Sequence, residues 1–421
     1  MNLKLRLQNI VSRFFELGKF RIFQIAVIIH VFYFIGSIIL FALKFEVDFE
    51  VYYKVGEIFI TNPSDLYNQA NYNFPFRYFP LCAVFFIPFS LLNYEFAFVL
   101  FNLFNLFLNI ITCVILYKII IIVRSKDDEI NDAKIITYIS LFLIGLPQGS
   151  NYVLGQINIY VVILVLISLY IFLRYEDLKW QLIGSVLLGI SIIIKPITIF
   201  LIPFLIVINY NLKERKLTYD IKKSLIRIIG IILPISLNLI LFLIYPPLLE
   251  GFIDANLTGS DPTILNFSFS ITKLLTNFFS FYQIPFNQLI IFTSVACVIG
   301  GIGFLIYFFR KVTQYSIIYA YLLGITIMLL VYFDSWDHHL LIIIPLLIVT
   351  IFNLPNNSNI AKRYIIPGFF VLNFLNLIFI LIYGFTESFF PYNFVSTIFL
   401  LLILLGIGMY SLNTKKSTKE S

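Results

Sequence analysis

Long apolar runs without charge constrain the fold of this 421-residue chain more than any other feature of its sequence. Ile228–Tyr245 and Phe394–Met409, for example, hold no charged residue at all. In a bilayer the backbone must satisfy its own polar groups, either as a helix or as a closed barrel. Barrel strands alternate apolar and polar residues, which these runs do not. The sequence therefore predicts membrane helices and an all-α fold.

The overall composition agrees with burial in lipid. Sixty per cent of the residues are hydrophobic and only 12% are charged, whereas a soluble domain carries roughly 25% charged residues. The net charge of +7 comes from short basic clusters between apolar runs. Such clusters set the orientation of a membrane protein, so we expect membrane lipids as partners and no nucleic acid.

The distribution of basic residues predicts a topology. We expect a single transmembrane domain at 22–412 with about 12 crossings, a basic cytoplasmic N-terminus at 1–21 and a cytoplasmic tail at 413–421. Two long outer loops, at about 44–92 and 246–285, leave the outer face with the material for a site. The apolar runs fall at about 22–43, 80–123, 135–147, 157–174, 180–194, 197–209, 225–245, 287–309, 314–332, 339–353, 364–383 and 393–412.

Four of the middle runs, from 135–147 to 197–209, are shorter than the roughly 20 residues that a straight helix needs to cross a bilayer. Short helices leave a recess below the outer surface, where irregular backbone can line a cavity. This recess is the predicted active site.

The first outer loop offers a candidate base. From Asp48 to Thr61 the apolar and polar residues occupy opposite faces at helical spacing, which predicts a helix lying flat on the membrane. Asp48 would stand at its N-terminal end, where an ionised carboxylate is favoured. The same position also suits an N-capping aspartate without a chemical role.

Cations and amides occur further along the chain. Lys195 precedes Pro196 in an apolar stretch, so it is either a functional residue or a lysine that reaches to the interface. His338 and His339 follow Trp336 in a short outer turn, and adjacent histidines on a helix point in different directions, so we expect no metal between them. Gln156 and Asn158 begin a helix near the recess, where they either bind sugar hydroxyls or cap the helix. Asn102, Asn105 and Asn109 share one helix face, which favours hydrogen bonds between helices.

The order of these motifs resembles a known family. Asp48-x-x-x-Tyr52-Tyr53, Asp65-Leu66-Tyr67, and Phe76-Arg77-Tyr78-Phe79-Pro80 with Pro88 resemble the first outer loop of glycosyltransferase family 87. Its members are multi-helix GT-C membrane mannosyltransferases, among them the mycobacterial phosphatidylinositol mannoside enzymes. Gly155-Gln156-x-Asn158 with Gly189 and Lys195-Pro196 resembles the family's middle segment, and Asn266-x-Ser268 and Ser335-Trp336-x-His338 resemble two later motifs.

The resemblance implies a GT-C type bundle and transfer of a hexose, first of all mannose, from a polyprenyl phosphate donor to a glycolipid or glycan hydroxyl. The reaction would invert the anomeric centre at the outer side of the plasma membrane, without a cofactor. Metal independence is preferred, although Asp334, Asp337 and Asp48 could meet around an ion. Asp48 would be the general base. The donor phosphate would meet Lys195, His338 and Arg77, with His339 ranked after His338. The residues expected to contact the sugar or the acceptor are Tyr53, Tyr52, Gln156, Asn158, Tyr78 and Trp336.

The main alternative is a transporter or flippase of lipid-linked glycans. Such a protein would carry charged residues through both halves of the membrane and show internal symmetry. Here the candidates gather toward the outer side and no repeat is evident in the sequence. The enzyme is therefore the preferred interpretation.

Overall fold

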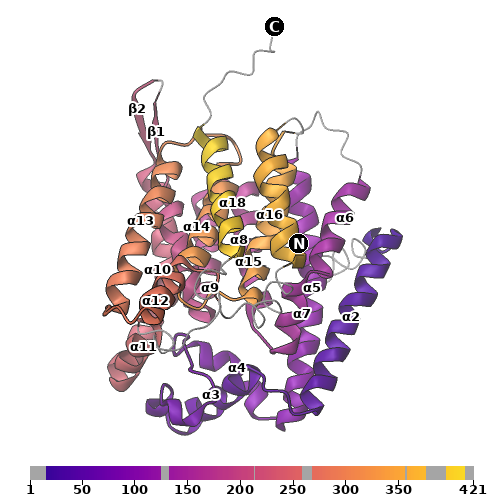
Figure 1. Cartoon of the computed structure of the whole chain (residues 1–421), viewed down its shortest axis with the longest axis vertical. Helices are drawn as coiled ribbons and strands as arrows, with labels where there is room; N and C mark the ends of the chain where they lie inside the picture. The colour runs from indigo at the N-terminus through magenta and orange to yellow at the C-terminus, as the bar shows by residue number, and fades with distance from the viewer. Residues whose placement is uncertain are drawn as a thin grey trace.

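A computed structural model of the chain describes residues 16–124, 132–212, 214–257, 268–355, 358–375 and 395–412. Most of the described chain is helical, and longer helices such as α2, α5 and α13 run roughly along the long axis of the molecule (Figure 1). The helical prediction is confirmed, except for one short β-hairpin at 208–219. The sequence predictions for residues 1–15, Asn266, 376–394 and 413–421 fall outside the described ranges.

Among the described residues, four helices are long and apolar enough to cross a membrane: α2 (Arg21–Ala42), α5 (Tyr94–Val123), α10 (Ile221–Ile244) and α13 (Gln288–Phe308). Shorter apolar helices accompany them: α8 (Asn158–Arg174), α9 (Leu178–Ile194), the 3₁₀-helix η3 (Pro196–Leu205), α14 (Ser316–Val331), η4 (Asp337–His339) with α15 (Leu340–Asn353), and α18 (Val395–Leu412). The short middle helices agree with the lengths of the apolar runs.

The remaining elements are shorter or lie at the ends of the bundle. They are α3 (Phe49–Thr61), η1 (Pro63–Asp65), η2 (Gln69–Asn71), α4 (Cys82–Ser90), α6 (Asp132–Leu143), α7 (Leu146–Val153), α11 (Pro247–Leu257), α12 (Ile271–Phe281), the π-helical turns η5 (Ala361–Ile365) and η6 (Val371–Leu375), and α16 (Ile366–Phe370) between these turns.

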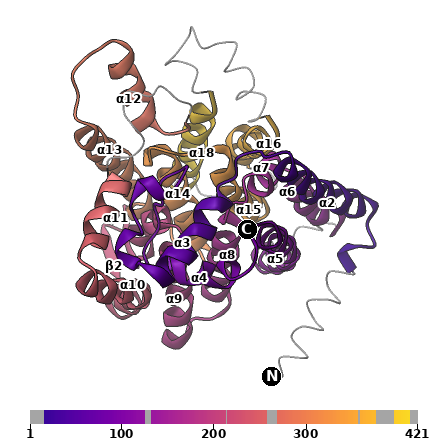
Figure 2. The same ribbon diagram turned by 90° about the horizontal axis from the view of Figure 1, so that it is seen from below.

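The predicted helix after Asp48 is present as α3. It buries Phe49, Val51, Tyr52 and Val55 on one side and packs against α4. Figures 1 and 2 show α3 and α4 lying across the lower end of the bundle. Asp48 occupies the N-cap position of α3, but its side chain makes no capping hydrogen bond to this helix.

The structure corrects three segment boundaries. The apolar run 80–123 breaks into α4 and α5, because the side chain of Asn93 caps α5 by accepting from the backbone N–H of Phe96 at 2.9 Å. The interval between the apolar runs 135–147 and 157–174 contains most of α7. The segment 197–209 is a 3₁₀-helix that leads into an antiparallel hairpin, β1 (Ile208–Asn211) and β2 (Lys216–Tyr219), at the end of the bundle opposite α3 (Figure 1).

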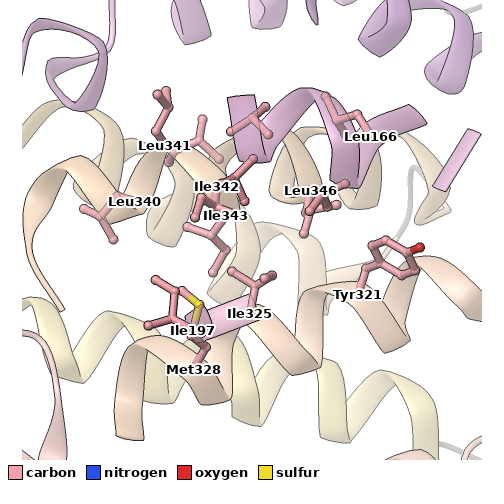
Figure 3. Close-up of a cluster of buried hydrophobic side chains, with 14 of the residues drawn as sticks. Leu166, Ile197, Tyr321, Ile325, Met328, Leu340, Leu341, Ile342, Ile343 and Leu346 are labelled. Carbon is pink, nitrogen blue, oxygen red and sulfur yellow. The ribbon is translucent and has the colours of Figure 1, made fainter. Parts of the chain in front are cut away.

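Two helices form the centre of the bundle. Almost every residue of α14 and α15 is buried. Figure 3 shows side chains of both helices packed with Leu166 of α8 and Ile197 of η3. The outer helices differ, since α2, α10 and α13 expose many large apolar side chains, and Leu243 reaches 81% exposure. So large an apolar surface has no stable place in water, which is why lipid must cover it.

Close packing of α9 and α10 depends on Gly189. A Cβ atom at this position would lie 2.4 Å from the carbonyl oxygen of Ile231 and 2.4 Å from Cγ of Pro234. The oxygen belongs to the backbone of α10, so the two helices would have to move apart to admit a methyl group. A Cβ atom on Gly36 of α2, in contrast, would have no neighbouring heavy atom within 4 Å.

We therefore expect Gly189→Ala to lower the free energy of unfolding by about 1–3 kcal/mol through overpacking. Gly36→Ala is the matched control, and it should leave stability unchanged or raise it by up to about 1 kcal/mol, because alanine favours a helix more than glycine does. Thermal unfolding in detergent measures both. Equal melting temperatures for the two variants would contradict the proposed close contact.

Candidate active site

A cavity of about 380 Å³ opens beside α3, a size that suits a small-molecule ligand. It lies where the first loop, the start of α8, the turn between α9 and η3, α11 and the segment before α15 meet. Its lining residues are Asp48, Val51, Tyr52, Phe74, Pro75, Arg77, Tyr78, Gln156, Lys195, Pro196, Ile197, Asn256, Tyr332, Asp334, Trp336, His338 and His339.

Most of the residues expected at the site line this cavity, but two do not. Tyr53 points away, because its hydroxyl donates to the carbonyl oxygen of Leu92 at 2.7 Å. Asn158 is completely buried behind the cavity wall. Neither residue is among those that line the cavity.

Asp48 is held by an amide. Gln156 donates from Nε2 to Oδ2 of Asp48, and the hydroxyl of Tyr52 donates to Oε1 of Gln156 at 3.1 Å. Burial raises the pKa of the Asp48 carboxyl, while the hydrogen bond from Gln156 and the charge of Lys195 lower it. A carboxylate with a raised pKa is suited to accept a proton.

A left-handed glycine brings Gln156 to Asp48. Gly155 has a φ of +64°, and the backbone N–H of Phe49 donates to the carbonyl oxygen of Leu154 at 3.3 Å. A Cβ atom on Gly155 would lie 2.7 Å from Cβ of Phe49. Only glycine adopts this conformation freely and leaves room for the start of α3.

Lys195 is the C-cap residue of α9 and only 3% of it is exposed. Its Nζ donates to Oδ1 of Asn158 at 2.6 Å, and Nδ2 of Asn158 donates to Oδ1 of Asn151 at 3.3 Å. Asn158 thus holds the ammonium group of Lys195 by a hydrogen bond, and Lys195 itself lines the cavity.

The segment before α15 supplies further donors. Arg77 forms an ion pair with Asp334, which lines the same cavity. Within the described chain, three buried nitrogen atoms of cavity residues have no hydrogen-bond partner: Nε of Arg77, Nε1 of Trp336 and Nδ1 of His338. Buried donors are normally paired, so these three fit an anionic or hydroxyl-rich ligand.

The two histidines have different environments. Nδ1 of His339 accepts a hydrogen bond from the backbone N–H of Trp336 at 3.1 Å. Nδ1 of His338 lies 3.9 Å from Oδ1 of Asp337 and has no hydrogen-bond partner in the described part of the protein. Among the described residues, no three His, Cys, Asp or Glu side chains are grouped closely enough to hold a metal ion.

Several lining residues were not predicted. Tyr332, Phe74 and Pro75 carry no distinctive signal in the sequence. Asp334 was considered only as one of several possible metal ligands. Asn256 fits a glycosylation triplet, yet it lines the cavity and donates from Nδ2 to the carbonyl oxygen of Phe252 at 2.9 Å.

The chain matches a known protein family. The model of glycosyltransferase family 87 aligns with residues 76–332, more than half of the sequence. The match includes Arg77, Gln156 and Lys195, whereas Asp48 and His338 lie outside it. No curated protein and no solved structure matches the chain.

The contact between Lys195 and Asn158 predicts an energetic coupling. Asn158→Leu should remove the acceptor of a buried ammonium group and cost roughly 1.5–3 kcal/mol of stability. Lys195→Met should also destabilise the protein, but the double variant should recover part of the loss, because neither buried group is then left alone. Melting temperatures of the four proteins in detergent give the coupling. Strictly additive losses would show that the two side chains do not depend on each other.

Proposed function

This chain belongs to glycosyltransferase family 87, and from that premise we propose that it transfers a hexose, with mannose as the first candidate, from a polyprenyl phosphate donor to a hydroxyl group of a glycolipid or glycan. The observation that supports this most directly is the single cavity that holds Asp48 together with Lys195 and Arg77. A base and cations for a leaving phosphate are the groups that such a transfer needs.

Asp48 is the proposed general base. The acceptor oxygen attacks the anomeric carbon and its proton passes to the carboxylate of Asp48. The bond between that carbon and the phosphate oxygen breaks, and the phosphate leaves with the electron pair. Attack from the side opposite the phosphate inverts the anomeric centre. The leaving phosphate is already activated, so this scheme requires neither cofactor nor metal.

The cations are proposed to act on the phosphate. Negative charge grows on its oxygens as the bond breaks, so donors fixed in place stabilise the transition state more than the ground state. Lys195 and the unpaired nitrogen atoms of Arg77 and His338 are the proposed donors. His339 would assist from the same wall. Tyr52, Tyr78, Trp336 and Gln156 line the remaining wall, where the sugar and the acceptor would bind.

We further propose how the protein sits in the membrane. The helix α3 would lie parallel to the membrane at the outer face of the plasma membrane, with the cavity beside it. The basic hairpin, with exposed Arg215 and Lys216, stands at the opposite end (Figure 1), where the excess of basic residues expected of a cytoplasmic face would lie. About 12 crossings, with both termini inside, would complete this arrangement.

We expect Asp48→Asn to reduce transfer by a factor of about 10²–10⁴, the usual contribution of a positioned base. The test supplies radiolabelled polyprenyl phosphate mannose to membranes that contain the protein and follows label in glycolipids. Glu50→Gln is the matched control, since Glu50 is a carboxylate on α3 that pairs with Lys54 outside the cavity. It should retain activity.

Equal transfer by the Asp48→Asn and unaltered proteins, at equal expression, would remove Asp48 from the mechanism. No transfer by either would show that the donor or the acceptor differs, and other lipid-linked sugars would then be supplied. If label crossed the membrane without forming a new glycosidic bond, the transporter alternative would be favoured instead.

A further inference from the structure

The contacts of Gln156 suggest a role other than sugar binding. We propose that Gln156 is a positioning residue, which Tyr52 and Tyr78 hold in one orientation so that its amide occupies Oδ2 of Asp48 and leaves Oδ1 to receive the acceptor's proton. This inference rests on the proposed function, because it describes how the base of that reaction is prepared.

A chain of hydrogen bonds sets the orientation of the amide. The hydroxyl groups of Tyr78 and Tyr52 are 2.8 Å apart, and the hydroxyl of Tyr52 donates to Oε1 of Gln156 at 3.1 Å. Since Oε1 faces Tyr52, Nε2 must face Asp48, to which it donates. The reversed amide would place its carbonyl oxygen against the carboxylate, an arrangement in which neither side can donate.

Packing holds the residues of this hydrogen-bonded chain in place. Tyr52 is only 1% exposed, and its ring stacks on Phe86 with centroids 4.8 Å apart and an angle of 10°. Gln156 directly follows the left-handed Gly155, so the backbone also fixes the position from which the side chain of Gln156 extends. Few rotamers of Gln156 can therefore satisfy both neighbours.

The electrostatics show why a base in this place needs the amide. Burial favours the neutral form of Asp48 and raises its pKa, and the hydrogen bond from Gln156 is the first of two effects that lower it again. The second is Lys195, across the cavity. Tyr52 and Tyr78 also face the carboxylate, and Arg77, His338 and His339 line the same cavity. Within this group, Gln156 donates directly to the carboxylate.

A positioning role and a sugar-binding role predict different kinetics. Loss of a sugar contact would weaken the reaction by a similar factor at every pH. Loss of the amide donor would raise the pKa of Asp48, so more of the base would be protonated at low pH. Activity requires the ionised carboxylate, and therefore the acid limb of the pH profile would move to higher pH.

The experiment measures kcat/KM against pH for the intact protein and for Gln156→Leu and Gln156→Glu. A hydrogen bond to a charged group corresponds to a shift of about one to two pH units, so Gln156→Leu should move the acid limb upward by that amount. Gln156→Glu should move it further, because a second carboxylate beside Asp48 opposes ionisation. In both variants the loss of activity relative to the intact protein should shrink as the pH rises.

Gln148→Leu is the matched control. Gln148 is a buried glutamine of α7 that donates to Oδ1 of Asn109 at 2.8 Å and does not line the cavity. Its replacement should lower stability without moving the acid limb. Tyr52→Phe should move the limb in the same direction as Gln156→Leu but by less, since it only frees the amide to turn.

A pH-independent loss in Gln156→Leu would overturn the proposal, and so would an equal shift in Gln148→Leu. An infrared titration separates this result from failure of the proposed function. The carboxyl band of Asp48, identified as the band lost in Asp48→Asn, titrates whether or not the protein transfers sugar. Its midpoint should rise in Gln156→Leu, and an unchanged midpoint would refute the positioning role even if no activity were found.

Discussion

A half-buried carboxylate and a buried ammonium group near each other must be hydrogen-bonded in place, and the site depends on one nine-residue segment that carries the partners of both. Within 150–158, Ser150 donates to Asp337, Asn158 accepts from Lys195 and Gln156 donates to Asp48. This one segment therefore contacts the start of α3, the turn after α9 and the segment before α15. An isolated charge at these positions would be too costly to bury, so each charge in the site needs its partner.

A second set of buried amides holds this segment against the bundle. Asn102 donates to Oγ of Ser37 at 3.2 Å and Asn109 to the hydroxyl of Tyr152 at 3.4 Å, so the asparagine face of α5 joins α2 and α7, as the sequence predicted. His30 shares Tyr152 with this cluster, at 3.0 Å from the hydroxyl. Inside an apolar bundle such bonds fix the register of neighbouring helices.

The sequence predicted the residue types of the site better than their orientation. Asp48, Lys195, Arg77 and His338 stand out because charged or titratable side chains are rare in so apolar a chain. Tyr52 and Tyr53 are adjacent and chemically identical, and only the packing of α3 decides that Tyr52 lies inside and Tyr53 outside. Tyr332, which belongs to the wall, looks in the sequence like any other aromatic residue of an apolar segment.

The fold was predictable to a similar degree. Apolar runs reveal helices because their signal is summed over many residues. The break between α4 and α5 depends on one capping asparagine, and α7 is only eight residues long. Neither feature therefore produces a strong pattern in the sequence. The hairpin β1–β2 is held partly by Asn209, which donates to the carbonyl oxygen of Phe308. The two residues are 99 positions apart in the sequence, so no local sequence pattern indicates their contact.

The separation of Asp48 from Gln156 has a consequence for biogenesis. The two residues are 108 positions apart, so a ribosome that inserts the chain from its N-terminus completes α3 long before it makes the amide. Until then the carboxylate has to remain solvated at the membrane surface, because its hydrogen-bond donor Gln156 has not yet been made. Helix α3 can pack on α4 and α5 as soon as these are made, but Asp48 receives its hydrogen bond only later, so a chain arrested before α8 would present the site with its carboxylate unpaired.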